Sequence, residues 1–153
     1  MSYEEHAKSI GITIPQAATP VGAYVPAVRG GTLLFTAGQG PMKESAPVFK
    51  GKVGQDLTIE QGYEAAKLAT LNCLAAAKSV LGTLDQIERI VKVNGYVNSA
   101  PGFTEQAKVM NGASDLLGQI FGEKGRHART SVGVSELPLN ITVEVELVLA
   151  CRP

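Results

Sequence analysis

The chain is poor in cysteine, in aromatic residues and in net charge. Its 153 residues include two cysteines, no tryptophan and only 5% aromatic side chains. Cys73 and Cys151 lie far apart, without the CxxC or Cys/His spacing of a zinc site. These features exclude a disulfide-rich scaffold and predict no metal site. They favour reduced thiols in a cytoplasmic protein.

The charge balance and the hydrophobic pattern exclude two further classes of partner. Lys and Arg number 14 in all, and so do Asp and Glu. A short basic cluster within residues 124–129 does not change that balance, so we expect no nucleic-acid partner. No apolar run is long enough to span a bilayer, and the polar, acidic first residues are unlike a signal peptide. We therefore expect a soluble protein without a membrane partner.

What the sequence does contain is one domain with a sizeable core. Hydrophobic residues make up 44% of the chain, and no repeat, linker or low-complexity tract divides it. We predict a single domain over 1–153, of which 1–21 form a short N-terminal helix and an extended lead-in. Ser2 and Glu5 have the spacing of a capping box at the start of that helix.

Hydrophobic periodicity predicts two long helices and three strands before residue 127. In order, these are a hairpin over 24–38 that turns at Gly30-Gly31, a helix over 58–81, a strand over 90–97 and a helix that begins at Phe103 or Thr104 and runs to Phe121. Residues 42–56, between the hairpin and the first long helix, are predicted to be a loop. With both long helices on one face, the fold is an α+β two-layer sandwich. Its sheet is expected to be mixed but mainly antiparallel.

Residues 127–150 are the most informative stretch and read as two strands joined by a turn over 137–140. In the second strand Glu144 and Glu146 alternate with an apolar set of Ile141, Val143, Val145, Leu147 and Leu149. In the first strand Val132 and Val134 would face the core. The opposite set is Arg129, Ser131, Gly133 and Ser135. If the two strands pair antiparallel, Arg129 lies beside Glu144 and Glu146.

This pattern has an ordinary interpretation and a functional one. The ordinary one is a half-solvated hairpin with a surface ion pair, which contributes little stability. The functional one rests on the small residues around Arg129, which leave room for a ligand. A guanidinium group there can bind a carboxylate through two parallel hydrogen bonds.

A compound motif adds a resemblance to a known family. Residues 128–134 (Ala-Arg-Thr-Ser-Val-Gly-Val), the Leu137-Pro138 turn and the strand 141–146 with its two glutamates resemble the C-terminal signature of the Rid family. These are the YjgF-like reactive-intermediate (enamine/imine) deaminases. The resemblance implies a chorismate-mutase-like fold and homotrimers with clefts between subunits. It also implies cofactor-free hydrolysis of 2-imino acids such as 2-aminoacrylate to 2-keto acids and ammonium.

The resemblance also implies roles for individual residues. Arg129 would clamp the carboxylate of the substrate, and Glu144 would orient the attacking water or stabilise the guanidinium. The residues implied to contact the substrate are Tyr24 (from the adjacent subunit), Gln39, Asn111 and Ser131. Taken alone, Tyr24 fits ordinary packing and Asn111 a solvated helix position. His127, two residues before Arg129, fits a peripheral position better than that of a catalytic base.

Two departures from the family pattern keep other functions open. Ala37 stands where many of these deaminases carry Ser, and Ser131 where they carry Cys. One alternative is a non-catalytic protein that binds small carboxylates or regulates through them. The other is an endoribonuclease, against which the balanced charge and the lack of a basic, aromatic-lined stripe both count.

The open face of the sheet would be partly apolar, which favours self-association.

Overall fold

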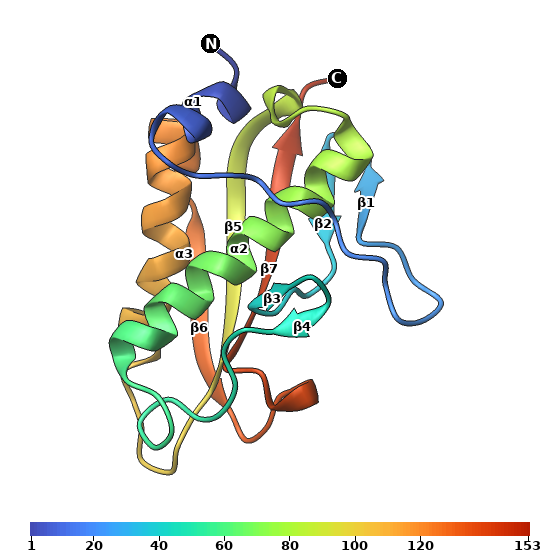
Figure 1. Cartoon of the computed structure of the whole chain (residues 1–153). Coiled ribbons are helices and arrows are strands. Elements are labelled where there is room, and N and C mark those ends of the chain that lie inside the picture. The colour runs from blue at the N-terminus through green and yellow to red at the C-terminus, as the bar shows by residue number, and fades with distance from the viewer.

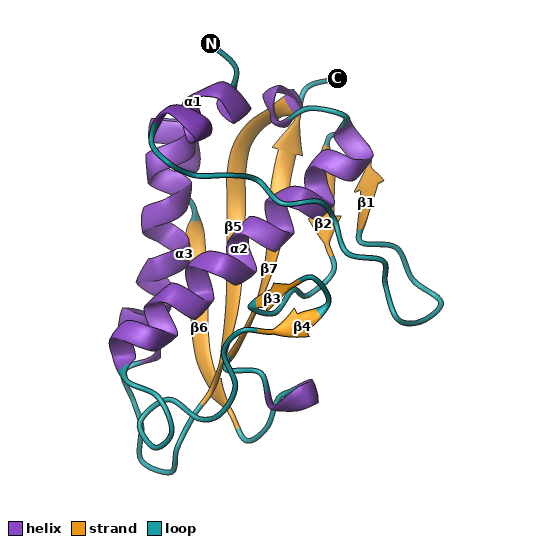
Figure 2. Cartoon of the chain, in the orientation of Figure 1, coloured by secondary structure: helices purple, strands orange, loops and turns teal.

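The computed structural model describes all 153 residues, and it has a five-stranded sheet covered on one face by two long helices (Figures 1 and 2). The helices are α1 (Tyr3–Ser9), α2 (Ile59–Leu81) and α3 (Gln106–Phe121). The strands are β1 (Ala27–Gly30), β2 (Leu33–Thr36), β3 (Met42–Lys43), β4 (Ala46–Pro47), β5 (Ile87–Asn98), β6 (Ala128–Val134) and β7 (Val143–Cys151). Short 3₁₀ turns are η1 (Leu84–Gln86), η2 (Gly122–Gly125) and η3 (Pro138–Asn140). The predicted α+β two-layer sandwich is confirmed.

Side-chain caps fix where the first two helices begin. Ser2 and Glu5 form the predicted capping box of α1, with Glu5 N donating to Ser2 Oγ at 3.1 Å. Thr58 and Gln61 cap α2 in the same way. Each box satisfies two backbone N–H groups that the first helical turn leaves free.

Small residues let α2 pack closely on the sheet. Its buried face consists largely of alanines, and Cys73 lies among them with its Sγ 3.2 Å from the carbonyl oxygen of Val145 on β7. Burial raises the pKa of the Cys73 thiol to about 12. The thiol therefore stays protonated and behaves as a small hydrophobic side chain.

Two turns differ from the predictions. The β1–β2 hairpin turns at Gly31-Thr32, because Gly30 already pairs with Leu33. Residues 42–56 are not simply a loop, since β3 and β4 form a small two-stranded sheet there. Its turn uses Glu44 and Ser45, both with positive φ. That sequence lacks the Asn-Gly or Asp-Gly signal that usually marks such a turn.

The predicted pairing of the last two strands is wrong. The sheet order is β1-β2-β7-β5-β6, so β5 lies between the strands expected to form a hairpin. β6 pairs with β5 alone and runs parallel to it. Helix α3 between β5 and β6 provides the long crossover that parallel strands require. Residues 135–142 then carry the chain past the end of β5, as Figure 2 shows.

The predicted faces are right for β7 and inverted for β6. Val143, Val145, Leu147 and Leu149 of β7 are all buried, as expected. On β6, however, Arg129 is in register with the buried Val93 of β5 and so faces the helices. Val132 is in register with Tyr96 and is 42% exposed on the open face. The physical reason is that α3 presents polar side chains to β6 instead of an apolar surface.

Candidate functional site

Arg129 is held by three neutral acceptors from α3. Its Nη1 donates to Asn111 Oδ1 and to Ser114 Oγ, both at 3.0 Å, and its Nη2 donates to the carbonyl oxygen of Ala107 at 3.3 Å. None of the four salt bridges in the chain includes Arg129. A guanidinium has five N–H donors, so two remain for a ligand. Two parallel donors are what a carboxylate accepts.

A cavity of about 300 Å³ adjoins this arginine. It is lined by Ser114, Gly118, Gly125, Arg126, His127 and Arg129. The lining contains two guanidinium groups and no carboxylate, so it suits an anion. Because β6 is an edge strand, one side of this site has no neighbouring strand within the chain.

Ser131 lies two residues beyond Arg129 on the same face of β6. Its hydroxyl oxygen is buried and has no hydrogen-bond partner in the protein. Asn111 contacts the guanidinium directly. Three of the six predicted site residues, Arg129, Asn111 and Ser131, therefore gather where β6 meets α3.

Glu144 lies on the other face of the sheet. Burial, and then the charge of Glu146, raise the pKa of the Glu144 carboxyl above its ordinary value. Glu146 accepts a hydrogen bond of 2.7 Å from the Tyr96 hydroxyl, which raises the pKa of Tyr96 to about 12. A Cβ placed on Gly38 would lie 2.8 Å from Cδ of Glu144, so only glycine leaves that carboxyl its space.

The predicted pairing of Arg129 with Glu144 does not occur within one chain. The two side chains are on opposite faces, and β7 and β6 are separated by β5. Two strand spacings amount to about 10 Å. Tyr24 is farther still: it precedes β1, at the other edge of the sheet, and is 56% exposed.

Gln39 belongs to a different cavity. Its backbone pairs with Val145 on β7, so its side chain faces the helices and not Glu144. It lines a space of about 690 Å³ between the N-terminal lead-in, the β3–β4 turn and α2. Within one chain, Gln39 therefore contacts neither Arg129 nor Glu144.

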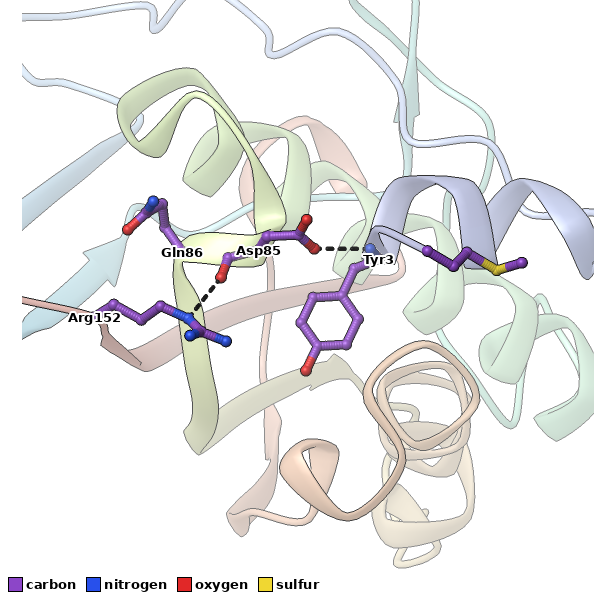
Figure 3. Close-up of a pocket in the computed structure, with 5 residues that line it drawn as sticks. Tyr3, Asp85, Gln86 and Arg152 are labelled. Carbon is purple, nitrogen blue, oxygen red and sulfur yellow. Dashed lines mark hydrogen bonds between the residues drawn. The ribbon is translucent and has the colours of Figure 1, made fainter.

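A third cavity, of about 550 Å³, lies where the two ends of the chain meet (Figure 3). Asp85 joins these ends, because its carboxylate accepts from Tyr3 N at 2.9 Å and its carbonyl oxygen from Arg152 Nε at 3.0 Å. None of the predicted site residues lines this space. We assign the contacts around Asp85 to anchoring the termini.

No group of three or more His, Cys, Asp or Glu side chains is placed to hold a metal ion.

Ser114 was not predicted from the sequence, and His127 was predicted to be peripheral. Ser114 contacts both Arg129 and His127. The signal was present in α3, because Ala107, Asn111 and Ser114 recur at spacings of four and three and so share one face of the helix. A polar pair on that face indicates a partner other than an apolar core.

The fold and the site together define a class of protein. A mixed five-stranded sheet with two helices on one face is the chorismate-mutase-like arrangement. Residues 4–150 match the family described as "YjgF/chorismate_mutase-like, putative endoribonuclease". The chain belongs to this family, which confirms the YjgF-like resemblance.

Relatives cover nearly the whole chain. Protein TCP17 of Trypanosoma cruzi is 44% identical over 138 residues, which are 90% of this chain and 86% of that protein. A RutC family protein of Aquifex aeolicus is 32% identical over 139 residues, 90% of this chain and 95% of that one. A solved Shewanella oneidensis structure described as a "putative endoribonuclease" is 36% identical, with a TM-score of 0.94 and coverage of 98% of this chain and 99% of that one.

None of the helices in this chain combines the length and apolarity needed to cross a membrane.

Proposed function

We propose that the protein hydrolyses reactive 2-imino acids, or the enamines that tautomerise to them, to 2-keto acids and ammonium. The observation that carries this proposal is the Arg129 guanidinium, which neutral acceptors hold beside a cavity with two donors left free. That geometry suits the carboxylate of a small substrate. A clamp of this kind fixes the imine carbon for attack by water.

Glu144 supplies the acid–base chemistry in this proposal. Water adds to the imine carbon, giving a carbinolamine, and loss of ammonia from it leaves the 2-keto acid. The addition and the loss each move a proton between oxygen and nitrogen. A carboxyl whose pKa is raised by burial and by Glu146 exchanges protons nearer to neutral pH than an ordinary glutamate.

The complete site requires two copies of the chain in this proposal. Arg129, Asn111 and Ser131 would come from one copy, and Glu144 and Tyr24 from the next. Support comes from the open face of the sheet, which exposes Val28, Leu33, Phe35 and Val132. An apolar surface of that kind favours association. We propose a homotrimer, and a cytoplasmic location in keeping with the buried free thiols of Cys73 and Cys151.

The alternatives use the same fold. TdcF of Escherichia coli, at 22% identity and a TM-score of 0.61, shares the fold and has been solved with bound serine. Ser131 and Ala37, which replace the Cys and Ser of many deaminases, favour a second candidate: a carboxylate-binding protein without turnover. A ribonuclease activity, as the family description suggests, finds little support in a chain with 14 basic and 14 acidic residues.

Imine turnover tests the proposal directly. An amino-acid oxidase generates the 2-imino acid, and the release of the 2-keto acid is followed with and without the protein. We expect the wild type to accelerate release and Arg129→Ala to lose the acceleration while light scattering shows an unchanged assembly. Equal rates with wild type, variant and no protein would exclude turnover. Binding of 2-oxobutanoate without turnover would instead favour the second candidate, and RNA cleavage that survives repurification would favour a nuclease.

A further inference from the structure

A chain of hydrogen bonds runs from Arg129 through Ser114 and His127 to the backbone of Gly125. Arg129 Nη1 donates to Ser114 Oγ at 3.0 Å, and Ser114 Oγ lies 2.9 Å from His127 Nε2. His127 Nδ1 lies 2.6 Å from the carbonyl oxygen of Gly125. All four residues line the cavity beside Arg129.

The chemistry of these groups fixes the direction of every hydrogen bond. A carbonyl oxygen only accepts, so His127 Nδ1 carries the proton and Nε2 is an acceptor when the ring is neutral. The Ser114 hydroxyl then donates its proton to Nε2. A lone pair of the same oxygen accepts from Arg129. The backbone of Gly125 thus orients the imidazole, the imidazole orients the hydroxyl, and the hydroxyl orients the guanidinium.

The surroundings keep the His127 ring neutral at physiological pH. Burial has the largest effect and lowers the pKa of His127. The hydrogen bond with Gly125 raises that pKa, and the charge of Arg129 lowers it. Three other charged side chains on neighbouring elements have partners of their own. These are Arg126 with Glu123 (3.6 Å), Asp115 of α3 with Tyr63 (2.7 Å), and Lys92 of β5 with Thr130 on the open face (3.0 Å).

We propose that Ser114 and His127 are positioning residues for the carboxylate ligand of Arg129. Through Ser114, neutral His127 directs Nη1 of the guanidinium toward α3 and leaves the Nε edge free for the ligand. Protonated His127 would donate to Ser114, so two cationic donors would share the lone pairs of one hydroxyl, and the hydrogen bond from Arg129 to Ser114 would weaken. The ligand in this inference rests on the proposed function, whereas the hydrogen-bond chain belongs to the free protein.

Four variants separate positioning from a general effect on folding. Ser114→Ala and His127→Phe each break the chain of hydrogen bonds. His127→Gln keeps an acceptor for Ser114 and should restore what His127→Phe loses. His6→Gln is the matched control, because His6 is the other histidine of the chain and contacts the carbonyl oxygen of Gln119 (2.9 Å), away from Arg129.

The first measurement needs no ligand. In ¹⁵N NMR of the free protein, we expect the His127 ring to be protonated on Nδ1 and free on Nε2, and rotation of the Arg129 guanidinium to be slow. Ser114→Ala and His127→Phe should speed that rotation about tenfold, while His127→Gln and His6→Gln leave it near the wild-type rate. A His127 ring protonated on Nε2, or a rotation rate that none of these variants changes, would overturn the inference.

The second measurement is the Kd of 2-oxobutanoate, a stable keto acid that does not titrate between pH 5 and 8. We expect Ser114→Ala and His127→Phe to raise Kd about tenfold and His127→Gln to stay within about twofold. The wild-type Kd should rise as the pH falls through the pKa of His127, and that of His127→Gln should not. Identical Kd values and pH profiles in all variants would overturn the inference. If the wild type binds no keto acid, the proposed function fails, and the NMR result alone decides the positioning role.

Discussion

The two faces of the sheet carry opposite halves of the expected chemistry. The helix-covered face holds Arg129, which is oriented by Asn111 and Ser114 and has donors to spare. The open face holds Glu144 beside Glu146, with a raised pKa for Glu144 and exposed apolar neighbours. The cation is fixed but lacks an acid–base partner, and the carboxyl lacks a cation. This contrast supports the proposal that each chain contributes two half-sites, one on each face of the sheet.

The largest effect should come from removing the cation. Arg129→Ala should lower kcat/KM by about 1,000-fold, because a charge-assisted bidentate contact is lost together with the positioning of the substrate. Thermal unfolding should change little, since Arg129 makes no ion pair. Arg126→Ala is the control, because Arg126 lines the same cavity but is largely exposed and pairs only loosely with Glu123. Equal losses in both variants would contradict a specific clamp.

A charge on the open face should separate the half-sites. Phe35 is 44% exposed on β2, and Phe35→Lys should dissociate the assembly and lower activity about 100-fold, because it places a charge in an apolar contact. Val80 on α2 is equally exposed, at 44%, so Val80→Lys is a matched control that should leave the assembly intact. Light scattering gives the subunit count of each. A fully active Phe35→Lys monomer would mean that one chain suffices.

Glu144→Gln should lower kcat about 30-fold, because it removes the proton-transfer group, and should raise Tm at neutral pH. The pKa of Glu144 is raised in the folded chain, so the folded state holds the proton more tightly. The wild type is therefore most stable below the unfolded pKa and loses stability as the pH rises through the folded value. The gain in Tm should vanish in acid. Glu88→Gln, at an exposed position on β5, should show neither effect, and a Glu144→Gln variant with a lower Tm at neutral pH would contradict this assignment.

A smaller effect should follow from moving Glu144 without removing it. Gly38→Ala places a Cβ only 2.8 Å from Cδ of Glu144, which is closer than normal contact allows, so the carboxyl must shift. We expect kcat to fall about tenfold while the Kd of 2-oxobutanoate at Arg129 stays unchanged. A change in that Kd alone would indicate that Gly38 acts on the Arg129 half instead.

The smallest effect concerns stability alone. Thr142 is fully buried, and its Oγ1 has no hydrogen-bond partner in the protein. Thr142→Val should therefore raise the free energy of unfolding by about 1 kcal/mol, since an unpaired buried hydroxyl is costly. Chemical denaturation measures the difference. A destabilised variant would mean that the hydroxyl has a partner in solution.

Local patterns predicted most of the elements but not how they pair. The capping box at Ser2 and the alternation of β7 depend on neighbours in sequence, and both were predicted. The parallel pairing of β6 with β5 depends on how α3 crosses the sheet, which no local pattern records. The face of β6 was inverted because neither of its alternating sets is strongly apolar. The polar face of α3 at Asn111 and Ser114 determines which set of β6 side chains faces the helices. Those two residues contact Arg129, which is 15 or more positions away in the sequence.

For the site, the sequence indicated which residues take part but not which of them lie close together in the fold. The motif around Arg129 identified the cation and, through the family resemblance, Asn111. It could not reveal that Glu144 lies on the opposite face or that Gln39 lines a separate cavity. Both depend on the strand order and on register across the sheet. His127 was underrated because its role depends on Ser114, a partner 13 residues away on another element.

Complementation between two inactive variants tests the shared site most directly. Arg129→Ala and Glu144→Gln proteins are each unfolded, mixed in equal amounts and refolded together, and imine turnover is measured. If each site takes Arg129 from one copy and Glu144 from the next, about a quarter of the sites regain both groups and activity recovers to about that fraction of wild type. A mixture no more active than either variant refolded alone would contradict the account.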